Sequence, residues 1–420
     1  MSYTKDKLTM LDKITTLVII LGPMFTQYAS VIDIILLPEL FLFPLILIYI
    51  LRNRSLQIWN IKGYFPYLFI VLVLTLLNIL IGTNVNISVS LSAFIRHAFY
   101  AFVIVTIGRK NFNIDFAAKT IVSVALINAV YGVIQYISYH FFGRILPWYF
   151  GFLPIKYGTY LIENQSYYFS NFGFRFSGLF SEPAHFSQYI AIALVVTLFY
   201  KSESFRIKRI SMVLLSILFI FVLLLNGSGT GFAMVLFVLS IVVVNLRGKK
   251  LTTVLLKYSL ITLAVFAIVY ISTSNALSMG LERILSTSEL SSSNIRIFRP
   301  FFIFSNLPFF NKIFGVGYAN YSEYVINSPL ATSYELSMKS AWTNTIGYIL
   351  VGSGFVGMLF YLRFYIHLLK KTKEFFRYLT LLLGLFAIFT EVPLSFQFIT
   401  IMGFLSNGIT TKSLVSCSKL

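Results

Sequence analysis

Twelve apolar runs, most of them long enough for a helix that crosses a bilayer, constrain this chain more than any other feature. Hydrophobic residues make up 58% of it, more than the roughly 45–50% that is usual in soluble domains. The sequence therefore predicts an all-α polytopic integral membrane protein with one transmembrane domain, residues 1–420. The expected spans are 14–32, 34–51, 64–83, 91–108, 117–139, 180–200, 210–226, 230–246, 255–272, 341–363, 378–392 and 395–411. The last two are short, and they form either a helical hairpin or one span broken around Pro393.

The basic residues fall in short clusters between these spans. Most of the 33 Lys and Arg residues lie in alternate loops and in the two tails, which is the positive-inside pattern of membrane insertion. This pattern predicts that both termini are cytoplasmic. The net charge of +19 is then explained by orientation in the membrane, and binding to nucleic acid is not expected.

Residues that bind metals are scarce. The chain has one cysteine, Cys417, and four histidines, none of them in an HxxxH or HExxH pair. Neither a disulfide framework nor a metal centre is expected, and no cofactor is predicted.

Two long segments are expected on the outer side, at residues 140–178 and 272–340. Both are too aromatic for disorder, so we expect them to lie on the membrane surface or to fold over a site. The second contains the amphipathic stretch 294–304, in which Arg296 and Arg299 are three residues apart and Pro300 is expected to cause a kink. An interfacial helix whose arginines contact lipid phosphates is the alternative interpretation.

The stretch 174–189, reading FRFSGLFSEPAHFSQY, brings three ionisable residues to the start of an apolar run. Ser181 or Glu182 can cap a helix there, and Pro183 suits its first turn. Glu182 and His185 are three residues apart and would share one face, with Arg175 just before the helix. Glu182 could accept a proton from a substrate hydroxyl, or His185 could do so while Glu182 orients it. A purely structural pair is the alternative.

Other residues are weaker candidates. Arg96, beside His97 within the fourth span, would bind an anion in an outward-facing cavity or extend to the membrane surface. Arg283, Arg299 and Asn344 are further candidates for binding a diphosphate or glycan. The glycine-rich stretch 226–231 lacks the GK[ST] ending of a phosphate-binding loop, so we expect a tight hairpin.

Five segments in this order resemble the O-antigen and capsular polysaccharide polymerase (Wzy) family, within the O-antigen polymerase/ligase superfamily. They read RFSGLFSEPAHF (175–186), NGSGTGF (226–232), SNIRIF (293–298), FGVGYANY (314–321) and TNTIGYILVGSGFVG (343–357). The resemblance covers roughly residues 90–360, and SEPAH is its most specific part.

The resemblance implies a GT-C-like glycosyltransferase in the bacterial cytoplasmic (inner) membrane, with its active site facing outward. Its substrates would be oligosaccharides linked to undecaprenyl diphosphate, and a growing glycan would be transferred onto a new lipid-linked repeat unit without a metal. Arg175 and Arg296 match the functional arginines of the two outer loops, and we add Glu182 and His185 as the catalytic acid–base candidates. Membrane lipids, a flippase and chain-length regulators are the implied partners.

Two other functions remain open. O-antigen ligases carry a histidine just before the last motif, where this chain has Trp342, Thr343 and Asn344, which lowers the probability of a ligase. A lipid-linked oligosaccharide flippase is the second alternative. Transporters carry charges within their spans and show internal repeats, whereas charge here gathers at the outer side and no repeat is visible.

Overall fold

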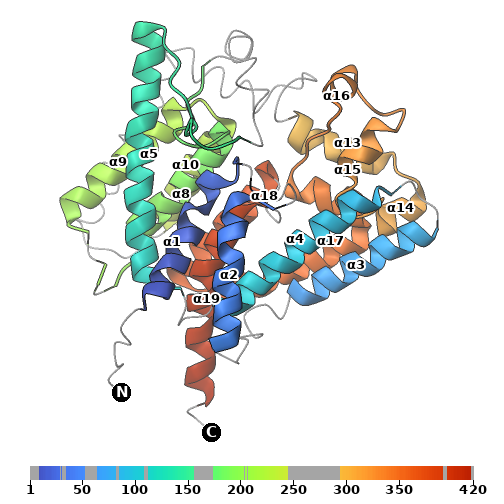
Figure 1. Cartoon of the computed structure of the whole chain (residues 1–420), viewed down its shortest axis with the longest axis horizontal. Coiled ribbons are helices and arrows are strands. Elements are labelled where there is room, and N and C mark those ends of the chain that lie inside the picture. Colours follow the sequence, from blue (N-terminus) through green and yellow to red (C-terminus); the bar gives the residue numbers. More distant parts are fainter. Residues whose placement is uncertain are drawn as a thin grey trace. The chain divides into compact units, whose positions relative to one another are not determined.

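The structure is a computed structural model that describes residues 9–28, 30, 35–52, 64–81, 85–107, 112–155, 174–202, 204–205, 207–244, 294–390 and 395–417. These residues are helical, apart from connecting segments and one isolated β-bridge. The chain divides into two compact units (Figure 1). The first unit comprises Met1–Leu56, Thr106–Ser278 and Thr400–Leu420, and the second comprises Gln57–Val105 and Met279–Ile399.

The first unit is built around a central helix. Its helices are α1 (Met10–Phe25), α2 (Leu37–Arg52), α5 (Ile114–Phe142), α8 (Pro183–Phe199), α9 (Arg209–Leu225), α10 (Gly229–Val244) and most of α19 (Phe396–Cys417). Helix α8 packs against α5, α9 and α10 (Figure 1). Every residue of α8 from Phe186 to Thr197 is buried. A helix that is apolar all round belongs in the interior, and α8 holds that position.

The second unit is organised by α17. Its long helices are α3 (Tyr64–Leu80), α4 (Ile87–Thr106), α17 (Thr345–Lys371) and α18 (Glu374–Phe389). Before α17 come a π-helical turn, η2 (Asn294–Phe298), and the short helices α13 (Arg299–Ser305), α14 (Phe309–Phe314), α15 (Tyr321–Ile326) and α16 (Ser333–Met338). Helix α17 packs against α3, α18, α13 and α14.

The helices follow the predicted spans. Every predicted span overlaps a helix, except 255–272, which lies outside the described residues. The last two spans correspond to two separate helices, α18 and α19. Among the described residues, α4, α5 and α17 are long and apolar enough to cross a membrane, and α2, α3, α8, α9 and α10 are shorter apolar helices. The structure thus supports a helical membrane protein.

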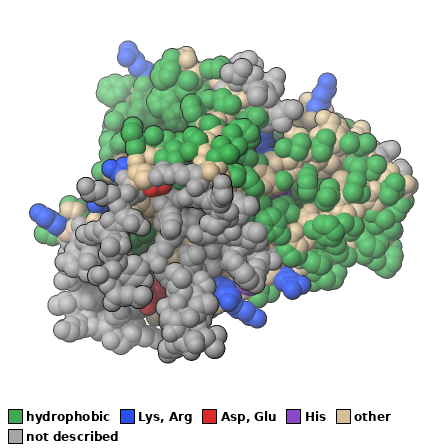
Figure 2. Space-filling model, turned by 60° about the horizontal axis from the view of Figure 1, so that its bottom comes forward, with side chains coloured by type: hydrophobic (Ala, Val, Ile, Leu, Met, Phe, Trp, Pro, Cys, Tyr) green, Lys and Arg blue, Asp and Glu red, His purple; other side chains and the backbone are tan. Residues whose placement is uncertain are grey.

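Helix α5 has one apolar exposed face and one buried face that contains polar residues. The exposed stripe consists of Ile127, Val130, Ile134, Ile137 and Phe141. The opposite face buries Asn128, Gly132 and Gln135. Hydrophobic side chains likewise cover much of the described surface in Figure 2, with Lys and Arg side chains protruding at its edges. Contiguous apolar surface of this kind is typical of contact with lipid.

Helix α17 is broken within its apolar part. Gly354 has φ 64° and ψ −169°, a conformation that is essentially restricted to glycine. Such a break frees backbone groups that must find partners, because an unsatisfied backbone group in lipid costs several kcal/mol. Part of this requirement is met by the segment before α15, since Val316 N donates to Val351 O at 3.0 Å.

The segment 314–320, which carries the FGVGYANY motif, is itself held by polar side chains. Asn78 of α3 donates to the Phe314 carbonyl at 3.2 Å. The Tyr318 backbone donates to Thr75 at 3.2 Å and accepts from Ser90 at 2.6 Å. Residues 315–320 have a non-helical backbone among apolar helices, and polar groups on α3 and α4 provide hydrogen bonds to the segment.

The described part of the second long segment, residues 294–340, forms short helices joined by turns. It contributes most of a hydrophobic core, made of Ile303, Leu307, Val316, Tyr321, Val325, Ala341 and Val351. Whether this segment lies on the membrane surface or folds over a site stays a prediction.

Candidate functional site

The SEPAH segment forms the amino-terminal end of α8, as predicted. Glu182 is the N-cap residue, with φ −130° and ψ 141°, and Pro183 is the first helical residue. The Glu182 side chain makes no capping bond to the helix. Arg175, Glu182 and His185 are all partly exposed. The helix end therefore presents an acid, an imidazole and a guanidinium from one short segment.

Three amide side chains hold the loop that leads into α8. Gln135 of α5 accepts from Gly178 N at 2.9 Å, and its Nε2 donates back to Gly178 O at 3.0 Å. Asn128 Oδ1 accepts from Leu179 N at 3.0 Å, and Gln27 Nε2 donates to Leu179 O at 3.3 Å. The backbone N–H and C=O groups of both Gly178 and Leu179 are thus hydrogen-bonded, which positions the ionisable residues on either side of them.

The loop also depends on two glycines. Gly178 has φ +59°, and a Cβ atom there would lie 2.9 Å from Asn128 Oδ1. A Cβ atom at Gly132 would lie 2.6 Å from the ring of Phe176, which is buried. Glycine at both positions lets the loop backbone approach α5 closely.

The second motif lies beside the first. Residues 226–228 form the short turn between α9 and α10, and Asn226 Nδ2 donates to the carbonyl of Phe176. A Cβ atom at Gly227, where φ is +65°, would lie 3.9 Å from Arg175 Cγ. One at Gly231 would lie 2.5 Å from the carbonyl oxygen of Leu223. The glycine-rich stretch is thus a tight turn, as expected, and it contacts the Arg175 segment.

The other three motifs belong to the second unit, where the FGVGYANY and TNTIGYILVGSGFVG motifs contact each other and SNIRIF lies just before α13. A Cβ atom at Gly347 would lie 2.2 Å from Pro300 Cβ, so α17 contacts the start of α13. One at Gly315 would lie 2.3 Å from the carbonyl oxygen of Gly352, and one at Gly354 the same distance from that of Ile313. Arg296 lies in η2, the π-helical turn just before α13, and is partly exposed.

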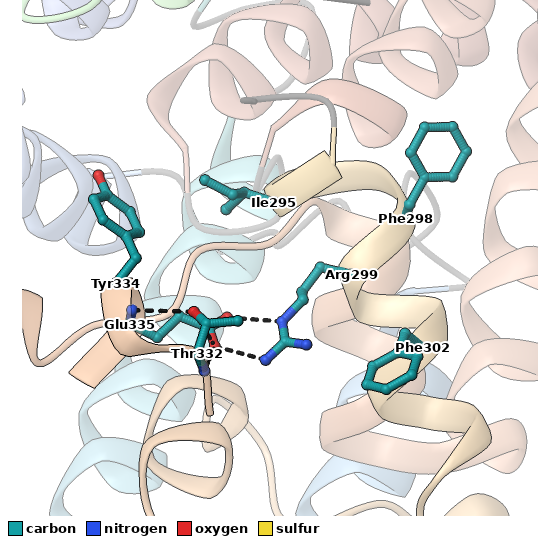
Figure 3. Close-up of a pocket in the computed structure, with 7 residues that line it drawn as sticks. All are labelled: Ile295, Phe298, Arg299, Phe302, Thr332, Tyr334 and Glu335. Atoms are coloured by element: carbon teal, nitrogen blue, oxygen red, sulfur yellow. Dashed lines mark hydrogen bonds and ion pairs between the residues drawn. The ribbon is translucent and has the colours of Figure 1, made fainter. Parts of the chain in front are cut away.

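Arg299 is paired with a carboxylate that the sequence analysis did not identify. Its Nε donates to Glu335 Oε1 at 3.0 Å and its Nη2 to Oε2 at 2.7 Å (Figure 3). Nη2 also donates to the Leu330 carbonyl. Thr332 N donates to the same carboxylate at 2.8 Å. Burial raises the pKa of Glu335, but the hydrogen bonds from Arg299 and Thr332 outweigh burial and hold that pKa below its ordinary value.

Asn344 stabilises the amino-terminal end of α17. Its Oδ1 accepts from Gly347 N at 2.7 Å, and its Nδ2 donates to the Ile388 carbonyl of α18 at 2.8 Å. It is almost fully buried. These contacts give Asn344 a structural role, and binding of substrate by this residue stays a prediction.

Arg96 is partly exposed on α4. Its neighbour His97 is buried and hydrogen-bonded to the hydroxyl of Tyr318. His97 thereby helps to hold the 314–320 segment. Arg283 lies outside the described residues.

The predicted site residues fall into two groups. Arg175, Glu182 and His185 belong to the first unit, and Arg96, Arg296, Arg299 and Asn344 belong to the second. No three His, Cys, Asp or Glu side chains come together as a metal site in the part of the chain that the structure describes.

The residues that hold the Arg175 segment were missed in the sequence, although a signal for some of them exists. Asn128, Gly132 and Gln135 recur at i, i+4 and i+7 within an apolar span and so share one helix face. Polar residues inside a span usually face protein or a cavity, so this face marks a polar contact. No comparable spacing links Arg299 to Glu335.

In comparisons with known proteins, neither a protein-family model nor a curated protein matches this chain. Its function therefore has to be inferred from its own residues.

Proposed function

We propose that this chain is a membrane glycosyltransferase that polymerises a surface polysaccharide. It would have twelve spans and a GT-C-like fold in the bacterial cytoplasmic membrane. It transfers a growing glycan from undecaprenyl diphosphate onto a lipid-linked repeat unit at the outer face. The observation that carries this proposal is the clamped segment 175–186, which brings Arg175, Glu182 and His185 to one end of the central helix of the first unit.

The reaction needs a base and a group that stabilises negative charge. A hydroxyl oxygen of the acceptor sugar bonds to the anomeric carbon of the donor glycan, while the bond from that carbon to the diphosphate breaks. Undecaprenyl diphosphate leaves with the bonding electrons, and the hydroxyl proton passes to Glu182 or His185. General-base catalysis of this kind contributes about 10²–10⁴-fold.

Arginine suits the leaving group. Its planar guanidinium binds phosphate oxygens in pairs and keeps its charge at any working pH. Preorganised positive charge at a developing anion typically contributes 10²–10³-fold in rate. In this proposal Arg175 supplies that charge, and the hydrogen bonds from Gln135 and Asn128 to the 178–179 backbone keep Arg175 in position. Arg296 of the second unit, which the resemblance also implies, is a separate candidate that the variants below test.

The test is polymerisation by the purified protein in detergent, with the lipid-linked repeat unit and EDTA. Glycan length is followed on a gel for the wild type and for Arg175→Ala, Arg296→Ala, Glu182→Gln and His185→Ala. We expect a ladder from the wild type, a loss of at least ~10²-fold for both arginine variants, and a similar loss for whichever of Glu182 or His185 is the base.

Two matched variants control for charge and for folding. Arg144→Ala removes an exposed arginine at the carboxyl end of α5, and Glu323→Gln alters a partly exposed acid on α15. Both should give the wild-type ladder. A full ladder from Arg175→Ala would overturn the assignment of that residue. Transfer of finished glycan to another acceptor without chain growth would identify a ligase instead.

A further inference from the structure

A small cavity lies between the start of α13 and the segment that leads into α16 (Figure 3). Its volume is about 230 Å³, and it is lined by Ile295, Phe298, Arg299, Phe302, Thr332, Tyr334 and Glu335. Sites for drug-sized ligands usually measure about 300–1,000 Å³. This cavity is smaller than that range, so it suits one ring of a larger molecule.

The charge balance of the cavity argues against a phosphate ligand. Among the described residues, the charged side chains that line it are Arg299 and Glu335, which form the paired contacts described above. A diphosphate that took Arg299 from this pair would leave a buried carboxylate uncompensated, at a cost of several kcal/mol. The cavity therefore favours a ligand without net charge.

Aromatic rings flank the ion pair. Phe302 is 50% exposed, and its centroid lies 5.5 Å from the Arg299 guanidinium carbon. Tyr334 lies on the other side of the pair in Figure 3, with its ring centroid 5.9 Å from that of Trp342. A ligand with an apolar face would cover such exposed ring surface favourably.

The ion pair also distinguishes a sugar from a lipid chain. The Arg299 and Glu335 side chains are 14% and 4% exposed, so water still reaches the pair at the cavity. An acyl chain would displace that water and offer no hydrogen bond in return, which is unfavourable beside charged groups. The hydroxyl groups of a sugar would replace the water.

We infer that this cavity is a subsite for one uncharged sugar ring of the glycan, packed against Phe302 and Tyr334 with hydroxyls toward the Arg299–Glu335 pair. The inference rests on the proposed function, because it takes the glycan as substrate. It assigns Arg299 to sugar recognition rather than to the diphosphate.

Trp342 supplies the readout, because its ring contacts Tyr334. The full-length protein in detergent is titrated with methyl glycosides of the neutral sugars in the host cell's surface glycan, with pyrophosphate and with a lysophospholipid. At least one glycoside should change tryptophan fluorescence saturably, and this change should be absent in Trp342→Phe. Pyrophosphate should not produce it.

Variants of neighbouring phenylalanines sharpen the test. Phe302→Leu should weaken glycoside binding about tenfold, since it keeps apolar volume but loses the ring, whereas Phe302→Trp should retain binding. Phe301→Leu is the matched control: it is 45% exposed on the same helix but does not line the cavity, and it should bind like the wild type.

The outcomes separate this inference from the proposed function. Equal binding by Phe302→Leu and Phe301→Leu, or saturation only by pyrophosphate or by a lysophospholipid, would overturn the subsite. Polymerisation by the wild type without glycoside binding would do so as well, and it would leave the proposed function standing. Glycoside binding that is reported by Trp342, without any polymerisation, would support the subsite and refute the polymerase.

Discussion

At the scale of single residues, Glu335 makes the clearest prediction about pH. Its pKa is lower in the folded protein than in the unfolded chain, because Arg299 and Thr332 stabilise the carboxylate more than burial disfavours it. The stability that Glu335 contributes is thus fully present above its ordinary pKa of 4.5, and it is lost as pH falls through its lower pKa in the folded protein. The protection of residues 330–340 against hydrogen exchange, measured relative to the intrinsic rate at each pH, should therefore decrease as pH falls below 4.5.

Glu335→Gln should remove this acid-dependent step and weaken protection of the same segment at pH 7 by about 2 kcal/mol, the usual range for hydrogen bonds to a charged group. Glu323→Gln on α15 is the control and should leave both unchanged. The same acid-dependent step in Glu335→Gln would show that another group causes it.

The roles of individual residues were only partly predictable from the sequence. The order Ser, Glu, Pro ahead of an apolar run predicted a helix start with Ser181 or Glu182 as the N-cap residue, and the structure places Glu182 there. The partner of Arg299 could not be predicted from the sequence, because Glu335 is 36 residues away and the pairing depends on how α13 and α16 fold together. The contacts of Asn344 across to α18 were unpredictable for the same reason.

At the scale of elements, the break in α17 predicts that two glycines cannot be replaced. Gly315 and Gly354 have positive φ, and a Cβ atom at either would lie 2.3 Å from a backbone oxygen. Gly315→Ala or Gly354→Ala should therefore destabilise the protein by ~3 kcal/mol or more, as strained backbone and overpacking together do. Thermal unfolding in detergent measures this.

Gly151→Ala is the matched control for these variants. No atom lies within 4 Å of a Cβ atom at Gly151, so this change should leave the unfolding temperature almost unaltered. An unfolding temperature of Gly354→Ala equal to that of the wild type would contradict the broken helix.

The amide contacts from α5 predict a second effect. Gln135→Met removes both hydrogen bonds to Gly178 while keeping a similar side-chain volume, and should loosen the loop that carries Arg175. A reporter cysteine introduced at Ser181 in a Cys417→Ser background should then react with maleimide about tenfold faster than in the same protein with Gln135 intact. Tyr131→Phe is the control: it removes a hydrogen bond from the same helix to the Pro147 carbonyl, and it should leave the reaction rate of the reporter cysteine unchanged.

Element positions were well predicted, whereas non-helical insertions were not. Hydropathy located the helices, since each described span coincides with one. The placement of residues 314–320 among α3, α4 and α17 was not predicted, because its hydrogen bonds come from single polar residues far apart in the chain, such as Asn78 and Ser90. Periodicity carries no information about such contacts.

At the scale of the whole molecule, two contacts within the first unit agree with alternating insertion. Gln27 follows α1 and hydrogen-bonds to Leu179 just before α8. Gln27 lies toward the predicted outer end of the span 14–32, and Leu179 lies between the predicted outer segment 140–178 and the span 180–200. Asp115 at the start of α5 accepts a hydrogen bond from Tyr200 after α8 at 2.7 Å, and both are predicted to be inside. Helix ends that the positive-inside pattern assigns to one side therefore meet in each case.

Cysteine labelling in intact cells tests this orientation. Single cysteines at Arg144, Phe309 and Lys201, all exposed, are introduced into a Cys417→Ser background. An impermeant maleimide should label the first two from outside, and the cysteine at Lys201 only after the membrane is permeabilised. The reverse pattern would invert the topology and place the Arg175 segment in the cytoplasm.

The most direct test of the central claim uses the purified wild-type protein, EDTA and one lipid-linked repeat unit. The glycan products are resolved by length, and the same protein in vesicles is tested for transbilayer movement of that substrate. A metal-independent polymerase predicts a ladder of products with undecaprenyl diphosphate released in proportion to the bonds formed. Movement of the substrate across the bilayer without any increase in glycan length would contradict the proposal and identify a flippase.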